Sequence, residues 1–281
     1  MSDLTAARAR LDALAAEWTV TIDRVAVGER AVLAFGIRDG GAVVLKVSAG
    51  EADENHAADV LEAFDGRGVV RLFARAPGAW LLERAVPGRT LEDVVAREGD
   101  DEATGLMAAT IERMTPGPAP AGVPAVGHWG VAFAAYQASG DTQIPAAVVS
   151  AAAEMYARLA DTQRNERLLH GDLHHGNVVF DGERGWMAID PKGVVGELEF
   201  ELGAALRNPW DRPDLFSDLH AVRRRARRFA EALLLDESRV LGWACAQAVL
   251  ADVWCVEDEG RVARGSPRLK MAQQLLESAP W

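Results

Sequence analysis

The chain has 281 residues, of which 49% are apolar, so it can bury a large core in one bilobal unit or in two domains. Its 42 acidic and 30 basic residues give a net charge of −12, which argues against nucleic acid and anionic membranes as partners and favours cationic small molecules. Two cysteines suggest neither a disulfide framework nor a metal site, and without a signal sequence or a run of about twenty apolar residues we expect a soluble cytoplasmic protein.

The first part of the chain has the pattern of a small sheet with helices beside it. Apolar residues recur at helical spacing across 2–18 and 51–64, and both segments are predicted to be helices. Asp39-Gly40-Gly41 predicts a hairpin turn. Five segments have the β-prone composition of strands, namely 19–22, 31–37, 42–47, 68–73 and 79–84.

Lys46 is a single cation inside the apolar strand 42–47. Taken alone, it reads as a lysine on a solvated strand face. The last strand, 79–84, runs out through Glu83-Arg84-Ala85, which we take as the connector to a second part of the chain. The segment Gly28-Glu29-Arg30, between the first two strands, has only one glycine and therefore no Gly-x-Gly-x-x-Gly pattern.

Helical patterns dominate the second part of the chain. Thr90 is a suitable helix cap, whereas the proline-rich segment 115–124 cannot be helix or central strand and is predicted to be an extended loop. The arginine run 223–228 reads as a solvated helix face rather than as a grip for RNA or phosphate. The acidic triplet 257–259 is either exposed or helps to bind a cationic substrate, and the sequence leaves both open.

The most informative stretch is the polar segment 170–177, His-Gly-Asp-Leu-His-His-Gly-Asn. Two β-prone segments with a glycine-bearing loop between them follow it and predict a hairpin. Antiparallel pairing places the residue that enters the first strand beside the residue that leaves the second. We therefore expect Asn177 and Asp190 to lie side by side, with Asp172 on the loop just before them. Two carboxylates and an amide oxygen form an oxygen-rich site that suits Mg²⁺.

The histidines of this stretch allow an alternative, because a His-x-Asp-x-His-His cluster can hold zinc. Zinc would need three of these side chains to converge, and the asparagine–hairpin–aspartate continuation would then be a coincidence. We favour the magnesium interpretation. In it, His170 is a buried residue that shapes the loop, and His174 and His175 brace it.

The spacing from His170 through Asp172 to Asn177 resembles the catalytic loop of protein kinases, and Asp190-Pro191-Lys192-Gly193 stands where those enzymes carry Asp-Phe-Gly. More narrowly, 169–177, 189–197 and 201–210 resemble the aminoglycoside 6-phosphotransferase (streptomycin kinase) and hydroxyurea phosphotransferase family. The resemblance implies an α+β, protein-kinase-like bilobal fold. Residues 1–84 would form a nucleotide-binding lobe with an antiparallel sheet, and 85–281 a mostly helical catalytic and substrate-binding lobe.

The resemblance also implies the chemistry, which is ATP-dependent transfer of phosphate to a hydroxyl of a small molecule. Asp172 would accept the hydroxyl proton or orient the nucleophile. Asn177 and Asp190 would hold Mg²⁺, and Lys46 would position the α- and β-phosphates of ATP. The connector from Glu83 to Ala85 would bind adenine through its backbone.

The chain departs from the family in the helix predicted at 51–64. Kinases carry a glutamate there that pairs with the strand lysine, but Ala57 occupies that position. Glu54 lies three residues earlier on the same helical face, and we predict that it reaches Lys46 instead.

The family resemblance points to streptomycin or a related aminoglycoside as the substrate and to antibiotic resistance as the function. Carboxylates would pair with its cationic groups, and the candidates are Glu199, Glu201 and Asp211. One alternative keeps the enzyme but makes its substrate an ordinary metabolite, such as a sugar or an amino alcohol. The other is a pseudokinase that binds nucleotide without turnover, which the missing helix glutamate suggests and the intact Asp172 opposes.

Overall fold

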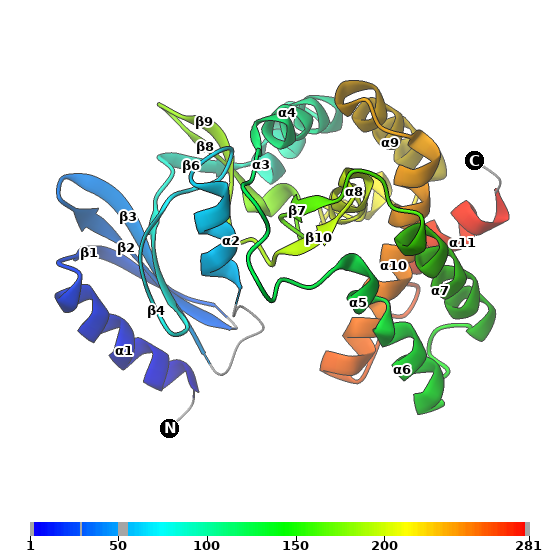
Figure 1. The fold of residues 1–281 in the computed structure, drawn as a ribbon, viewed down its shortest axis with the longest axis horizontal. Coiled ribbons are helices and arrows are strands. Elements are labelled where there is room, and N and C mark those ends of the chain that lie inside the picture. Colours follow the sequence, from blue (N-terminus) through cyan, green and yellow to red (C-terminus); the bar gives the residue numbers. More distant parts are fainter. Residues whose placement is uncertain (1–2, 29, 50–55, 279–281) are drawn as a thin grey trace.

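The computed structural model describes residues 3–28, 30–49 and 56–278, and these form two lobes (Figure 1). The small lobe contains a five-stranded antiparallel sheet of order β1-β2-β3-β5-β4. Its elements are α1 (Asp3–Glu17), β1 (Thr21–Val27), β2 (Ala31–Arg38), β3 (Gly41–Ser48), α2 (Ala57–Phe64), β4 (Leu72–Ala76) and β5 (Ala79–Glu83). The boundary after residue 84 stays a prediction, and the sheet ends next to it.

The helix α1 covers one face of this sheet (Figure 1). Its apolar residues pack against alternate residues of the strands, such as Val32 and Ala34 in β2 and Leu45 in β3. Side chains of a strand point to opposite faces in turn, so this alternation places one apolar face of the sheet under the helix. The predicted turn at 39–40 joins β2 and β3, as expected.

The strand predicted at 68–73 is wrong in its bounds, because the structure forms β4 at Leu72–Ala76. The residues before it turn away from the sheet, starting at Gly68 with φ of +73°. Gly68 and Val70 instead exchange hydrogen bonds with the backbone of Ala188, at 2.8 and 3.0 Å. The segment thus connects the small lobe to the hairpin that carries the candidate site.

The large lobe is mostly helical, and its core continues into the small lobe through α2. Three short strands, β6, β8 and β9, form one sheet, and β7 pairs with β10. The remaining elements are β6 (Pro87–Thr90), α3 (Leu91–Arg97), α4 (Asp100–Arg113), α5 (Val126–Trp129), α6 (Val131–Ser139), α7 (Ala146–Asp161), β7 (Arg167–Leu169), η1 (His175–Asn177), β8 (Val178–Asp181), β9 (Gly185–Ala188), β10 (Val194–Gly196), α8 (Leu198–Leu206), η2 (Pro213–Leu215), α9 (Leu219–Leu233), α10 (Glu237–Glu259) and α11 (Pro267–Glu277).

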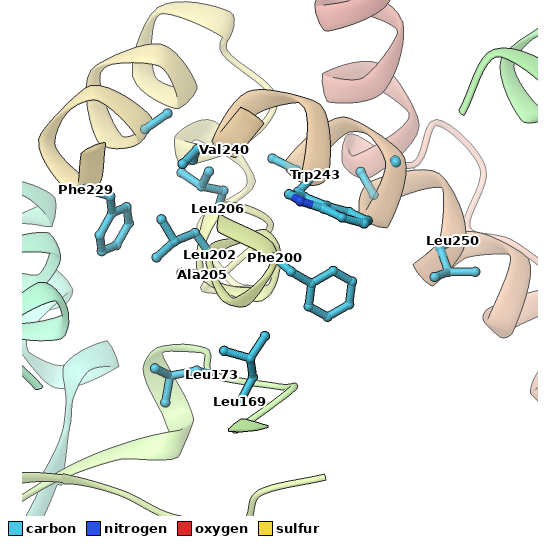
Figure 2. Close-up of a cluster of buried hydrophobic side chains, with 14 of the residues drawn as sticks. Leu169, Leu173, Phe200, Leu202, Ala205, Leu206, Phe229, Val240, Trp243 and Leu250 are labelled. Carbon is cyan, nitrogen blue, oxygen red and sulfur yellow. The ribbon is translucent and has the colours of Figure 1, made fainter. Parts of the chain in front are cut away.

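The helix α8 is the centre of this lobe. Figure 2 shows it between Leu169 and Leu173 of the segment 169–173 on one side and Val240 and Trp243 of α10 on the other. All but one of its nine residues are buried. The helix α8 therefore packs between α10 and the segment that carries the candidate site.

The helix α10 is long and apolar enough to cross a membrane by length and composition. However, 78% of its apolar 18-residue stretch is buried within the fold, and it packs against α7, α8 and α11. It is therefore the core helix of the large lobe.

The arginine run in α9 was expected to be a solvated face, and for Arg225 this is wrong. Arg225 is fully buried, and its Nε lies 3.1 Å from Asp100 at the start of α4. Arg224 and Arg228 form ion pairs with Asp100 and Asp101. Because the run alternates between buried and surface positions, it joins α9 to α4 by charge pairs.

The two lobes also meet at the surface through an ion pair. Arg30, which directly precedes β2, extends to Asp258 near the end of α10, with 3.1 Å between Nη2 and Oδ2. The side chains are 77% and 53% exposed. Arg30 of the segment 28–30 therefore contacts the large lobe, and Glu29 lies outside the described residues.

Candidate active site

The predicted hairpin is confirmed, and it brings the two expected metal ligands close together in the backbone. Strands β8 and β9 are antiparallel, with Val178 opposite Ala188. The N–H of Ile189 donates to the carbonyl of Asn177 at 2.9 Å, so Asp190 follows directly beside Asn177. The side-chain amide of Asn177 in turn donates to the carbonyl of Asp172 at 2.9 Å. One hydrogen-bond chain thus links the loop aspartate to both feet of the hairpin.

Lys46 reaches this group from the other lobe. Its Nζ lies 2.6 Å from Oδ1 of Asp190, and the lysine is largely buried whereas the aspartate is half exposed. Lys46 therefore does not lie on a solvated face. Ala57 is buried at the start of α2, and Glu54, the predicted substitute for the missing glutamate, lies outside the described residues.

The donor set at the hairpin feet fits Mg²⁺. Asn177 uses its Nδ2 toward Asp172, so its amide oxygen is left for a ligand, and Asp190 supplies a carboxylate. Mg²⁺ prefers oxygen and usually takes one or two protein ligands, with substrate phosphates and waters completing its octahedron. Asn177 and Asp190 match that pattern.

The zinc alternative is not supported. In residues 3–28, 30–49 and 56–278, no three His, Cys, Asp or Glu side chains converge to hold a metal ion. The histidines are engaged elsewhere: Nδ1 of His174 accepts from the N–H of Gly176 at 3.1 Å, and Nε2 of His175 lies 3.3 Å from Arg225.

His170 shapes the loop, as predicted. It is fully buried, and burial lowers its pKa to about 4, so the ring is neutral at pH 7. Nδ1 accepts from the N–H of Asp172 at 3.3 Å, and Nε2 lies 2.7 Å from the carbonyl of Ile189. The proton of the neutral ring is therefore on Nε2, which donates to Ile189. The ring thereby ties the loop to the second strand of the hairpin.

The loop begins with Gly171, where protein kinases carry arginine. Its φ is +84°, and a Cβ there would lie 3.1 Å from the ring of Trp129. Both features favour glycine. Trp129 packs edge-on against Trp254 of α10, so two aromatic rings lie beside the start of the loop.

Glu201 supports the same loop from α8. Its two carboxylate oxygens accept from the N–H groups of His170 and Gly171, at 2.6 and 3.0 Å. Burial raises its pKa to about 7. Glu199 is also buried, and burial raises its pKa too. These placements do not support the expected contact of Glu199 and Glu201 with a substrate.

Asp172 lies between two cations. Lys192 Nζ is 3.1 Å from Oδ2, and Arg207 Nη2 is 3.6 Å from Oδ1. Burial alone would raise the pKa of Asp172, but Lys192, Arg207 and His174 outweigh it and lower the pKa to about 2. Asp172 is therefore an ionised acceptor throughout the physiological range.

An acidic pair lies beside the loop. Asp211 is exposed, as is Glu92 of α3, and burial together with the charge of Asp211 raises the pKa of Glu92. The Oε1 atom of Glu92 is only 3.0 Å from where a Cβ of Gly176 would lie. Asp211 therefore remains a candidate for binding a cation, and Glu92 joins it.

The connector between the lobes is held by its own side chains. Glu83 accepts from the N–H of Arg71 at 3.0 Å and pairs with Arg184 in the turn between β8 and β9. The N–H of Arg84 donates to the carbonyl of Ala42 at 3.1 Å, and Ala85 packs against the large-lobe core. Glu83 thus fixes the connector to the hairpin, and adenine binding by this backbone stays a prediction.

Sequence reasoning missed Arg207, although it falls inside a segment used for the family resemblance. Its role depends on α8 packing against α10, which no local pattern indicates. It also missed Glu197, whose buried carboxylate accepts from Arg239 and from Trp243 at 2.6 Å. A glutamate at the N-cap of an apolar helix was the available signal.

Two lobes, a strand lysine paired with a hairpin aspartate and a loop aspartate beside an asparagine together define a kinase-like phosphotransferase. Solved structures share this fold. A choline/ethanolamine kinase family protein from Mesorhizobium loti has a TM-score of 0.67 at 15% identity, covering 98% of this chain and 95% of that chain. The aminoglycoside phosphotransferase APH(4)-Ia has a TM-score of 0.66 at 14% identity, covering 98% and 100%.

Sequence comparison specifies the family. Residues 18–259 match the profile described as aminoglycoside/hydroxyurea antibiotic resistance kinase, and the chain belongs to this family. The streptomycin 6-kinase of Streptomyces glaucescens is 32% identical over 97% of this chain and 90% of its own length. That of Streptomyces griseus is 34% identical over 84% and 78%, and the hydroxyurea phosphotransferase of Kitasatospora aureofaciens is 33% identical over 85% and 69%. The protein is therefore a kinase, as the sequence motifs predicted.

Proposed function

We propose that the protein transfers the γ-phosphate of ATP to a hydroxyl of streptomycin or a related aminoglycoside and thereby confers resistance to it. The observation that carries the proposal is the hydrogen-bond chain from Asp172 through Asn177 to the residue before Asp190, with Lys46 joining it from the other lobe. Two relatives are named for phosphorylating streptomycin, the streptomycin 6-kinases of Streptomyces glaucescens and Streptomyces griseus.

Each residue has a role in this reaction. The transition state of phosphoryl transfer is loose, so alignment and charge neutralisation matter more than strong basicity. A low pKa in Asp172 is compatible with that, because its task is to orient the hydroxyl and to receive its proton late. Lys46 would contact the phosphates, and Asn177 with Asp190 would hold Mg²⁺, which neutralises phosphate charge when bound.

The substrate class rests on charge. Asp211 and Glu92 form an exposed acidic pair next to the catalytic loop, and the chain as a whole has a net charge of −12. A cationic sugar would be attracted to this acidic pair, and a phosphorylated or acidic sugar would be repelled by it. Streptomycin carries cationic groups and hydroxyls, so it fits both requirements.

The test is a transfer assay with purified protein, MgATP and a panel of hydroxyl compounds, including streptomycin, hygromycin B, hydroxyurea and choline. Mass spectrometry should find a singly phosphorylated streptomycin, and fragmentation then identifies the modified ring. The Asp172→Asn variant is the control for contaminating kinases. If only choline or a plain sugar is phosphorylated, that compound replaces streptomycin as the proposed substrate. If no compound is phosphorylated, the proposed phosphotransferase activity is refuted.

A further inference from the structure

Arg207 is the buried partner of Asp172. It follows the last residue of α8, and its side chain is only 10% exposed, whereas that of Lys192 is 55% exposed. The two cations take different oxygens of the carboxylate, Arg207 facing Oδ1 and Lys192 facing Oδ2. One oxygen is therefore held from inside the protein, and the other faces the solvent side.

The guanidinium of Arg207 is fixed by a glutamine of α10. Nη1 donates to Oε1 of Gln247 at 3.0 Å, and Nε2 of Gln247 donates to the carbonyl of Phe200 at 2.6 Å. Gln247 crosses α8 at Gly203, where any Cβ would lie 2.3 to 2.5 Å from its amide group. Only glycine leaves room for the amide in this position, so α8 and α10 pack closely where Gln247 reaches Arg207.

The backbone of this segment is held as well. Arg225 is fully buried, and its Nη2 donates to the carbonyls of Ala205 and Asn208, both at 2.9 Å. A cation at a helix C-terminus also interacts favourably with the helix dipole. The end of α8 is thus fixed on either side of Arg207.

We propose that Arg207 is a positioning residue for phosphoryl transfer, holding Oδ1 of Asp172 so that Oδ2 is presented to the substrate hydroxyl. This inference rests on the proposed function. A buried ion pair adds little to stability compared with apolar packing, so stability alone does not account for an arginine that two helices are shaped to hold. Lys192, being exposed, leaves Oδ2 at little cost when the hydroxyl arrives.

The test compares turnover and KM in four variants of the full chain, with MgATP and streptomycin. In R207M, kcat should fall roughly 100-fold while both KM values change by less than about threefold, because the carboxylate is misaligned but binding surfaces persist. R207K restores a cation and should recover roughly tenfold of that loss. Q247L keeps the guanidinium charge but frees it, and kcat should fall about tenfold.

The matched control is R227M, which removes an exposed arginine of α9 that pairs with Glu237 of α10, and its kinetics should equal those of the wild type. A MgATP-induced thermal shift shows that each variant is folded and binds nucleotide. If R207M does not fold, R207K and Q247L carry the test. Unchanged kcat in these variants, or a rise confined to the KM for streptomycin, overturns the inference while leaving wild-type transfer intact. A wild type that transfers nothing overturns the proposed function, and this inference with it.

Discussion

The two halves of the candidate site are held in different ways. On the large-lobe side, the loop that carries Asp172 is tied by Glu201, His170 and Arg207, which are all buried in one lobe. On the phosphate side, Lys46 reaches Asp190 by an ion pair that crosses between the lobes. Under the proposed roles, the side that would bind the substrate hydroxyl (the acceptor side) is therefore organised in advance, whereas the phosphate side is complete only while the lobes are together.

The acceptor side should respond most strongly to the loss of its central carboxylate. In Asp172→Ala, turnover should fall roughly 10²- to 10⁴-fold, because the acceptor of the hydroxyl proton is gone. MgATP affinity, measured by calorimetry, should stay at the wild-type value, since the phosphate side is untouched. Turnover equal to that of the wild type would remove Asp172 from the mechanism.

The next largest effect tests whether the loop depends on its support. Glu201→Ala leaves the N–H groups of His170 and Gly171 buried without their acceptor, and the free energy of unfolding should drop by about 2–5 kcal/mol. Urea denaturation measures it. The control Glu166→Ala changes an exposed glutamate and should shift stability by less than about 0.5 kcal/mol. If Glu201→Ala lowers the free energy of unfolding by no more than Glu166→Ala does, the loop does not depend on its contact with α8.

The phosphate side should respond through ATP instead. In Lys46→Met, the KM for ATP should rise roughly 10- to 100-fold, as expected for loss of a charge-assisted contact. The KM for streptomycin should stay near its wild-type value. Lys270→Met, at an exposed lysine of α11, provides the control. A rise in the KM for streptomycin rather than in the KM for ATP would contradict the assignment of Lys46 to the phosphate side.

The support under the loop also predicts a pH dependence. The pKa of Glu201 rises from 4.5 to about 7 by burial, so between these values the folded chain holds a proton that the unfolded chain has lost. The unfolding free energy of the wild type relative to Glu201→Gln should therefore fall as pH rises through this window, by on the order of 2 kcal/mol. The buried histidines shift in both proteins and cancel. Parallel pH profiles would contradict the assignment.

The smallest kinetic effect is expected at the exposed acidic pair of Asp211 and Glu92. Asp211→Asn should raise the KM for streptomycin about two- to fivefold, because an exposed charge contributes little. High salt should abolish the difference between the two proteins, since it screens exposed pairs. A difference that persists in salt would mean that Asp211 contacts the substrate in a drier setting.

The hairpin was readable from the sequence, because a polar glycine-bearing loop between two β-prone segments is a local signal. The pairing of Asn177 beside Asp190 follows from it by geometry alone, and Lys46 followed from the family resemblance. Glu201 was expected to face the substrate because it follows Asp190, the expected Mg²⁺ ligand, in the chain. Its helix, however, is buried on nearly every side, and burial of that kind depends on α9 and α10, far along the sequence.

Arg207 and Arg225 illustrate the same limit. Both are arginines whose length and charge suggest the surface, yet both are buried where helices distant in sequence meet. The run 223–228 contains Arg225 four residues before the buried Phe229, so helical spacing would have indicated its inward face. For Arg207 the sequence carries no comparable signal, because its partner Gln247 is forty residues away.

The contact between Arg30 and Asp258 bears on how easily the two lobes can separate. It is a bridge between two exposed side chains across the rim of the lobes, and such bridges contribute at most about 1 kcal/mol. The need to break this bridge would slow the separation of the lobes by no more than about fivefold. This ion pair therefore adds little resistance to motion of one lobe against the other.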